Sequence, residues 1–285
     1  MTARTRLRLC LALPAVALIF TFMILPITNM AEMSFRTPGT TEPFGPDYTV
    51  MHYSRILGDG YYWSVLFRSL STAALVTVLC LIVSYPIAWH LSRAKGMKAV
   101  ILYACIVSPL MTGVLVRNFG WMIITALDGP LNETLMALGI LERPLRLLFT
   151  QGLVVLALVH VFVPFMVLPI NNALRNIPES LTEAAASMGA SRMQVFRDVT
   201  LPLSFPGIQP GMILVYVLAV AAYVTPALLG GQMVSTMPTL IIGELTGTFQ
   251  WPFGSALAIT LSVSTVLVVL IFTMATWKLL ERAKA

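Results

Sequence analysis

The segment between residues 178 and 206 has a residue spacing suited to docking onto another protein. Its apolar residues recur at i, i+3, i+4 and i+7, which predicts one narrow apolar stripe along a helix. They are Leu181, Ala184, Ala185 and Met188. Gly189 follows where helices commonly end in a left-handed residue, and Ser191 with Gln194 is typical of a capping box that starts a second helix. The pattern indicates a helix–glycine–helix elbow whose small alanines allow another backbone to approach. The second helix is expected to run to about Thr200 and to end at Pro202 and Pro206.

No set of residues in the sequence has a spacing typical of catalysis or of metal binding. The three cysteines, Cys10, Cys80 and Cys105, lie in apolar runs without CxxC or Cys/His spacing, which argues against a disulfide framework and a zinc site. Neither HExxH nor GxSxG occurs, and there is no GxxxxGK[ST] loop to hold nucleotide phosphates. We therefore expect a chain that is not an enzyme and that holds no metal and no cofactor of its own.

The elements that must position the elbow are membrane-spanning helices. Of the 285 residues, 58% are hydrophobic and only 11% are charged, whereas a typical soluble domain carries roughly 25% charged residues. This composition excludes a soluble enzyme, a disordered protein and a collagen-like fibre. A span needs ~20 mostly apolar residues, and the uncharged runs predict an all-α integral membrane protein with one transmembrane domain. The six expected spans cover about residues 9–29, 66–91, 99–124, 148–171, 207–229 and 255–277.

The first apolar run is interpreted as a retained helix and not as a cleaved secretion signal. It exceeds the usual apolar core of ~7–15 residues, and no small-x-small cleavage site lies between its end and Glu32.

Lysine and arginine predict the orientation of these spans. The N-terminus, the 91–98 loop, the 172–206 loop and the C-terminal tail carry three each, which is twelve of the eighteen. These segments are expected on the cytoplasmic side, with both termini, and segment 30–64 is expected to be an outer loop along the membrane surface. The net charge of +6 then reflects topology, so it gives no reason to expect nucleic-acid binding.

Several aromatic residues in or beside the spans could hold a cationic solute through cation–π attraction. They are Tyr85, Trp89, Trp121, Tyr216 and Tyr223. Each alone is more often a packing residue or part of an interfacial belt. Tyr223 is the strongest candidate, because Thr225, Pro226 and Gly230-Gly231 interrupt the helix around it, and irregular backbone at membrane depth is tolerated where it is buried or lines a cavity.

Arg117 is the only charged residue deep within an expected span. A charge there costs at least ~2.5–3.5 kcal/mol on insertion scales, so it normally faces protein or water. Arg117 could be a pathway or gate residue, or it could reach the outer interface or pair with an acid such as Asp128. For His160, also mid-span, a structural hydrogen bond is favoured over a role in the pathway. Gly207 and Gly211, in a GxxxG spacing, could bring the fifth span close to a neighbouring helix.

The elbow resembles the EAA loop of bacterial ABC-importer permeases. That motif reads EAA, three residues, Gly, nine residues, Ile-x-Leu-Pro. Here it is matched by Glu183-Ala184-Ala185, Gly189 and Val199-x-Leu201-Pro202, with Val199 in place of the usual isoleucine. A passive connector with chance alanine-rich helicity would not need the glycine and the Leu-Pro pair.

Further segments resemble the spermidine/putrescine (PotB/PotH-type) family of these permeases. They are Tyr85-Pro86-Ile87-Ala88-Trp89, Leu131-Asn132-Glu133, Pro144-Leu145-Arg146 with Phe149-Thr150, Tyr223 to Gly231, and Trp251-Pro252-Phe253-Gly254. The resemblance covers most of the chain from about residue 60 onward.

This resemblance implies an ABC type I importer permease in a bacterial inner membrane, with the elbow as its cytoplasmic coupling helix. The coupling residues would be Glu183, Ala184, Ala185, Met188, Gly189, Leu201 and Pro202. The implied partners are an ATP-binding cassette ATPase dimer that binds the ATP and Mg, a second permease subunit, and a periplasmic substrate-binding protein. The implied solutes are polyamines.

Other classes of transporter remain as alternatives. A related permease could carry an opine, an amino-acid derivative or an anion. A secondary transporter is less favoured, because no Asp or Glu lies at the centre of an expected span.

Overall fold

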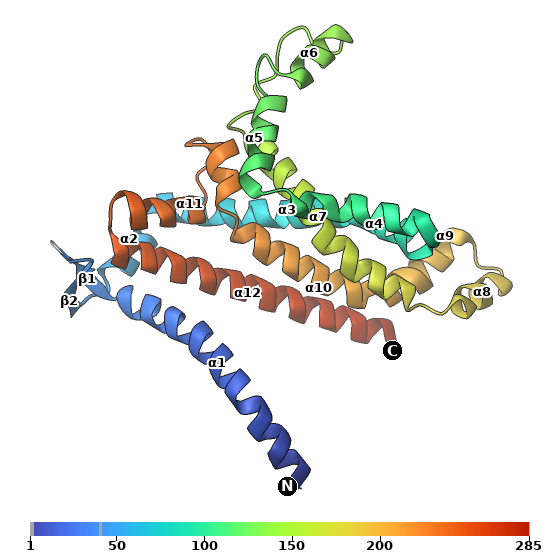
Figure 1. Ribbon diagram of the computed structural model, residues 1–285, viewed down its shortest axis with the longest axis horizontal. Helices are drawn as coiled ribbons and strands as arrows, with labels where there is room; N and C mark the ends of the chain where they lie inside the picture. The colour runs from blue at the N-terminus through green and yellow to red at the C-terminus, as the bar shows by residue number, and fades with distance from the viewer. Residues whose placement is uncertain (1–2, 40–41, 285) are drawn as a thin grey trace. The chain divides into compact units, whose positions relative to one another are not determined.

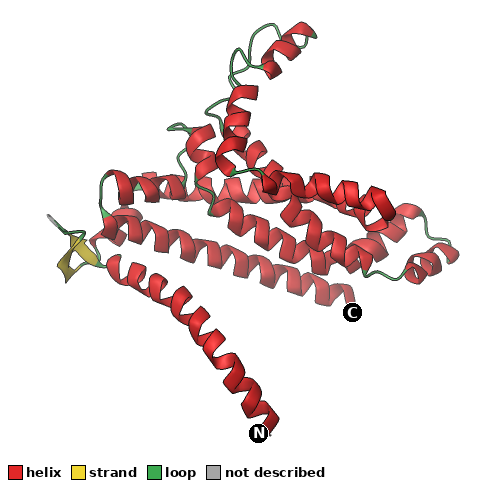
Figure 2. Ribbon diagram, in the orientation of Figure 1, coloured by secondary structure: helices red, strands yellow, loops and turns green. Residues whose placement is uncertain are grey.

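The computed structural model describes the backbone of residues 3–39 and 42–284, and the side chains of residues 14, 17–39 and 42–276. The basic residues at the two ends on which the orientation partly depends (Arg4, Arg6, Arg8, Lys278, Arg282 and Lys284) and Cys10 lie outside the described side chains. The described chain is mostly helical, with one small hairpin of two strands (Figure 2).

The helices and strands are labelled in chain order in Figure 1. The α-helices are α1 (Ala3–Met33), α2 (Met51–Gly58), α3 (Gly60–Arg93), α4 (Gly96–Met111), α5 (Val114–Ile124), α6 (Pro130–Ala137), α7 (Gln151–Arg175), α8 (Glu179–Ser187), α9 (Arg192–Val195), α10 (Leu201–Val220), α11 (Met237–Ile242) and α12 (Trp251–Lys284). Three π-helical segments are η1 (Phe196–Thr200), η2 (Pro226–Gly230) and η3 (Gly243–Gly247). The strands are β1 (Arg36–Pro38) and β2 (Phe44–Tyr48), which pair antiparallel.

Within the described residues, four helical stretches are long and apolar enough to cross a membrane. They are Gly60–Arg93, Gln151–Arg175, Arg192–Val220 and Trp251–Thr276. The pair α4 and α5, bent by 95° at the break between them, makes a fifth if the two cross together, and residues Ala17–Met33 of α1 form a shorter apolar helix. The expected span 99–124 is therefore divided into two helices.

The expectation that Pro202 and Pro206 end the elbow's second helix is wrong. Both prolines lie inside α10, and residues Arg192–Val220 run as one helical stretch. The reason lies in η1, where the N–H of Leu201 donates to the carbonyl of Phe196, five residues back. A π turn shifts the hydrogen-bond register, and it does so directly before Pro202, which occupies the first turn of α10 where a missing N–H is tolerated.

The described chain divides into two compact units, one formed by residues 1–64 and 240–263 and the other by residues 65–239 and 264–285. In the second unit, α7 and α10 pack closely together. A Cβ on Gly207 would collide with the carbonyl oxygen of Pro169 and would stand 2.6 Å from the Cβ of Ala173. A Cβ on Gly211 would lie 3.0 Å from Sδ of Met166. The GxxxG spacing does bring the helix close to a neighbour, and that neighbour is α7.

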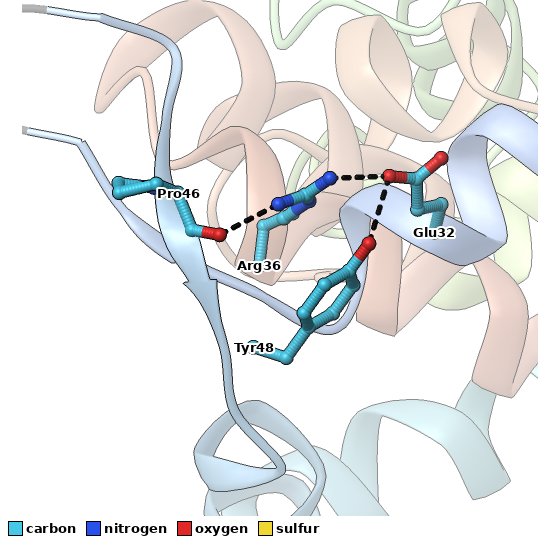
Figure 3. Close-up of polar contacts among 4 residues, drawn as sticks. All are labelled: Glu32, Arg36, Pro46 and Tyr48. Atoms are coloured by element: carbon cyan, nitrogen blue, oxygen red, sulfur yellow. Dashed lines mark hydrogen bonds and ion pairs between the residues drawn. The ribbon is translucent and has the colours of Figure 1, made fainter.

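In the first unit, an ion pair ties the end of α1 to the hairpin that follows it (Figure 3). Glu32 Oε1 accepts hydrogen bonds from Arg36 Nη2 at 2.6 Å and from the Tyr48 hydroxyl at 3.2 Å. Arg36 also donates to the carbonyl of Pro46 at 2.7 Å, and its guanidinium lies 4.2 Å from the centre of the Tyr48 ring. The hydrogen bond from Arg36 is the main cause, with that from Tyr48 second, of a pKa for Glu32 below its ordinary value.

This cluster predicts a hairpin whose order depends on pH. A carboxylate with a lowered pKa stabilises the folded state at a pH above its unfolded value, and that stabilisation is lost as the pH falls through the lowered pKa. We expect hydrogen-exchange protection factors in residues 36–48, corrected for the intrinsic rate, to fall on acidification, and Glu32→Gln to show the low value already at pH 7. Asp47→Asn is the control, because Asp47 has no ion pair in the part of the chain that the structure describes. Equal protection in wild type and Glu32→Gln at pH 7 would contradict the prediction.

Candidate functional site

The first helix of the elbow ends as the sequence predicts. Gly189 has φ +88°, in the left-handed region. Its N–H donates to the carbonyl of Ala186 at 3.0 Å, and the N–H of Ala190 donates to the carbonyl of Ala185 at 3.2 Å. These two bonds are those of a Schellman motif, which sets the direction in which the chain leaves α8.

The second helix of the elbow begins with the predicted capping box. The Ser191 N–H donates to Oε1 of Gln194 at 2.8 Å, and the Gln194 N–H donates to Oγ of Ser191 at 3.4 Å. One residue, Ala190, separates the Schellman glycine from this cap. Both ends of the turn are thus held by hydrogen bonds within the loop, so the elbow has a defined shape without a partner.

The apolar stripe expected along α8 is largely exposed to solvent. Met188 is 83% exposed and Leu181 is 44% exposed, and Ala184 is exposed as well, while Ala185 is buried. Glu183 is also exposed and makes no ion pair among the residues that the structure describes. In Figure 1, α8 projects beyond the ends of α7 and α10. An exposed apolar stripe next to a free carboxylate is a surface suited to a protein partner.

An aromatic joint connects the elbow to α3. The ring of Phe196, in η1, lies edge-on to Tyr85 and to Trp89, with ring centres 5.7 Å apart in both pairs. The Tyr85 hydroxyl is 3.1 Å from Oγ of Ser204, and the guanidinium of Arg93 lies 3.5 Å from the centre of the Trp89 ring. Edge-to-face pairs stabilise beyond their buried area, so a displacement of η1 would be transmitted to the end of α3. Leu201 and Pro202, directly after η1, continue into α10.

Two residues expected in the solute pathway, Tyr85 and Trp89, therefore contact the elbow. No local pattern in the sequence marks Phe196, because its partners Tyr85 and Trp89 are far away in the chain.

Arg117 makes contacts that join α4 to α5. Its Nη1 donates to the carbonyls of Pro109 at 2.9 Å and Thr112 at 3.2 Å. A cation beside the free carbonyls at a helix C-terminus is favourable, and here it stabilises the 95° bend. In the described chain it forms no ion pair with Asp128 or any other acid. Of the alternatives, this geometry favours a structural role.

A second polar cluster joins α5 to η2. Asn118 is 1% exposed, and its Nδ2 donates to Oγ1 of Thr225 at 3.2 Å. Trp121, one turn further along α5, packs edge-on against His160 of α7 with ring centres 5.8 Å apart. No hydrogen bond of the His160 side chain is found among the described residues. Its contact there is the one with the Trp121 ring. Tyr223 is 38% exposed in the break between α10 and η2.

Tyr216 contacts an apolar cavity of about 230 Å³ between α3, α10 and α12. The cavity is lined by Thr77, Val78, Met212 and Phe272 among others, and it offers little polar chemistry to a solute. Tyr216 itself is 8% exposed, which is typical of a packing residue. The structure thus separates the aromatic candidates into a joint beside the elbow (Tyr85, Trp89), a cavity wall (Tyr216), a ring contact with His160 (Trp121) and the break before η2 (Tyr223).

Among the described residues, no three His, Cys, Asp or Glu side chains lie close enough together to hold a metal ion.

Comparison with known proteins assigns the fold and the family. A family model described as "Binding-protein-dependent transport system inner membrane component" matches residues 7–279. The chain is 34% identical over 251 residues to the spermidine/putrescine transport system permease protein PotB of Salmonella typhimurium (strain SL1344), covering 88% of this chain and 87% of that protein. It is also 34% identical over 271 residues to PotB of Haemophilus influenzae, covering 94% of each.

A crystal structure of a bacterial ABC transporter involved in the import of the acidic polysaccharide alginate has the same fold. It superposes with a TM-score of 0.75 over 96% of each chain at 16% identity. At that identity the likeness concerns the fold alone, which is that of an ABC type I permease. The chain belongs to the family of binding-protein-dependent transport system inner membrane components, and it is an ABC-importer permease homologous to PotB.

Proposed function

We propose that this permease forms half of a transmembrane pathway for polyamines and that a separate ATPase drives transport through the elbow. The observation that carries the proposal is the shape and exposure of α8. Its turn is fixed by the bonds at Gly189 and Ser191, while Met188 and Leu181 stay open to a partner. Glu183 would pair with a basic group of the ATPase, and the Phe196 joint would pass the motion to α3.

The ATP and Mg would bind to a dimer of ATP-binding cassette subunits, because this sequence has no phosphate-binding loop. A second permease subunit would complete the pathway, and a periplasmic protein would deliver the solute. Alternating access would follow from rigid-body rotation of the spans when the ATPase pair closes.

The proposed topology has six spans with both termini in the cytoplasm of a bacterial inner membrane. The spans would be α1, α3, the bent pair α4–α5, α7, α10 and α12. The basic residues of the 91–98 and 172–206 loops lie on the elbow's side of the membrane in this topology, as the preference for cytoplasmic lysine and arginine requires.

Polyamines are proposed as the solutes because the PotB relatives that match most of the chain transport spermidine and putrescine by name. An anionic solute would be attracted by an available positive charge in the pathway. Arg117, the candidate for that charge, has its Nη1 bound to two backbone carbonyls, which weakens the argument for an anion.

Reconstitution of the complete transporter tests the proposal. The permease, its companion subunits and the binding protein should take up labelled putrescine or spermidine into proteoliposomes only when ATP is supplied to the ATPase side. Uptake of molybdate or sulfate in place of polyamines would overturn the proposed solute. Solute transport by this chain without any nucleotide-hydrolysing companion would overturn the proposed mechanism.

A further inference from the structure

Asn118 has a side-chain oxygen that no group of the described chain satisfies. Its Nδ2 is bound to Thr225, but its Oδ1 is buried and has no hydrogen-bond partner. Buried polar atoms in folded proteins are nearly always paired, and the requirement is stricter within a membrane, where water is scarce. Oδ1 of Asn118 is therefore free to accept a hydrogen bond from a donor outside the chain.

The surroundings of Asn118 suit a positively charged donor. Trp121 is one turn away on α5, so it lies on the same face as Asn118, and Tyr223 lies two residues before Thr225 at the break beside η2. Aromatic faces attract an ammonium group, more strongly when it is desolvated. Arg117, the residue before Asn118, donates through Nη1 to the carbonyls of Pro109 and Thr112 at the end of α4.

The chemistry of the vacant atom distinguishes between classes of solute. An ammonium group has three N–H donors and no acceptor, which matches an orphaned amide oxygen. An anion without an N–H or O–H group has nothing to donate to Oδ1, and one of the amide's two N–H groups is already bound to Thr225 at 3.2 Å.

The cluster is closed in this structure and lies beside a break in the helical chain. Asn118 is 1% exposed and Thr225 is 5% exposed. Thr225 directly precedes η2, and the chain between α10 and Thr225 is non-helical at Ala222 and Tyr223. π-Helical turns are frequent at functional sites. A shift of η2 away from α5 would break the single Asn118–Thr225 bond and open Oδ1 to the pathway.

We propose that Asn118 and Thr225 form an amine-binding site of the solute pathway, at which Oδ1 of Asn118 accepts a hydrogen bond from a primary ammonium group while Trp121 and Tyr223 offer aromatic faces. This inference rests on the proposed function, since it names residues that would contact the polyamine during passage.

Putrescine uptake by the complete reconstituted transporter tests this site. Asn118→Leu removes the acceptor, and KM should rise by roughly tenfold or more, the order expected when a hydrogen bond to a charged group is lost. Asn118→Asp retains an acceptor and adds a negative charge, so its KM should stay at or below the wild-type value. This opposite response of two substitutions at one position is not expected of a packing role.

Asn171 provides the matched control. It is a second buried asparagine, 6% exposed, whose Oδ1 also lacks a partner in the described chain, but it lies on α7 without the aromatic pair and the helix break. Asn171→Leu should leave the KM for putrescine within about twofold of wild type.

The outcomes separate this site from the proposed function. Wild-type uptake with an unchanged KM in Asn118→Leu overturns the site alone, and so does an equal rise in KM for Asn171→Leu. If Asn118→Leu does not insert, an inserted Asn118→Asp that loses uptake overturns it as well. Wild type that takes up no amine overturns both the polyamine assignment and the site.

Discussion

Replacing Gly189 with valine should abolish most of the ATPase coupling of the assembled importer while leaving the permease inserted in the membrane. An L-residue in the left-handed region costs about 1–2 kcal/mol, and a β-branched side chain is especially unfavourable there. No atom outside the glycine's immediate neighbours lies within 4 Å of a Cβ built on Gly189, so the cost falls on the backbone angle and not on packing. The turn would relax out of φ +88°, and α8 would leave its present direction.

The measurement is solute-dependent ATP hydrolysis in proteoliposomes that contain the binding protein. The strain corresponds to a factor of roughly five to thirty in an equilibrium, and we expect solute-stimulated hydrolysis and uptake to fall by at least that much. The amount of inserted protein should match wild type, because Gly189 lies outside the helical stretches that are long and apolar enough to cross a membrane.

Gly139 supplies a matched control for this prediction. It has φ +70°, has open space around its Cβ position and ends α6 with the same two bonds, Gly139 N–H to Met136 and Ile140 N–H to Leu135. Gly139→Val therefore introduces the same backbone strain outside the elbow. The importer that carries it should retain the solute-stimulated ATP hydrolysis of wild type. Normal stimulation in Gly189→Val, or an equal loss in Gly139→Val, would show that the shape of the elbow does not carry the coupling.

The elbow could be predicted from the sequence because its structure is determined locally. A Schellman glycine and a capping box each involve residues within a few positions of one another, so Gly189 and the Ser191–Gln194 pair mark the turn without knowledge of the rest of the fold. The hydrophobic runs are a similarly direct signal, since an apolar stretch must be buried in lipid or protein. These signals gave the elbow and the approximate positions of the long helices.

The features that the sequence does not supply depend on contacts between distant segments. Ring chemistry alone makes Tyr85 and Trp89 candidates for the pathway, and only the fold brings Phe196 against both of them. Arg117 could equally have paired with an acid, since a sequence does not show which carbonyls a bend will expose. The helix that continues through Pro202 depends on a π turn, a change of register that residue propensities do not report. The hairpin of residues 36–48 was not expected in a segment rich in proline and glycine, where strands are disfavoured.

Substituting alanine for Gly207 should destabilise the permease, although a Gly→Ala change within a helix ordinarily stabilises it by about 1 kcal/mol. The added Cβ would collide with the carbonyl of Pro169 and stand 2.6 Å from the Cβ of Ala173. Neither neighbour can rotate away, since one is backbone and the other is a single methyl group.

The expected cost follows from how helices associate in a membrane, which is through close packing more than through the hydrophobic effect. If α7 and α10 were forced apart, α10 would lose the contact that anchors it, and the elbow continues into α10. Overpacking of this kind typically costs 1–3 kcal/mol, so the apparent free energy of unfolding in detergent should fall by about that amount, and Gly207→Leu should prevent stable folding.

Gly211→Ala should be milder, because the group it meets is the flexible Sδ of Met166 at 3.0 Å. Gly120, inside α5 with no atom within 4 Å of its Cβ position, is the matched control, and Gly120→Ala should be neutral or stabilising. The sign of the change in the free energy of unfolding thus distinguishes an effect of close helix contact from an effect of helix propensity. A Gly207→Ala variant that is more stable than wild type would mean that α7 and α10 do not approach each other as closely as this packing requires.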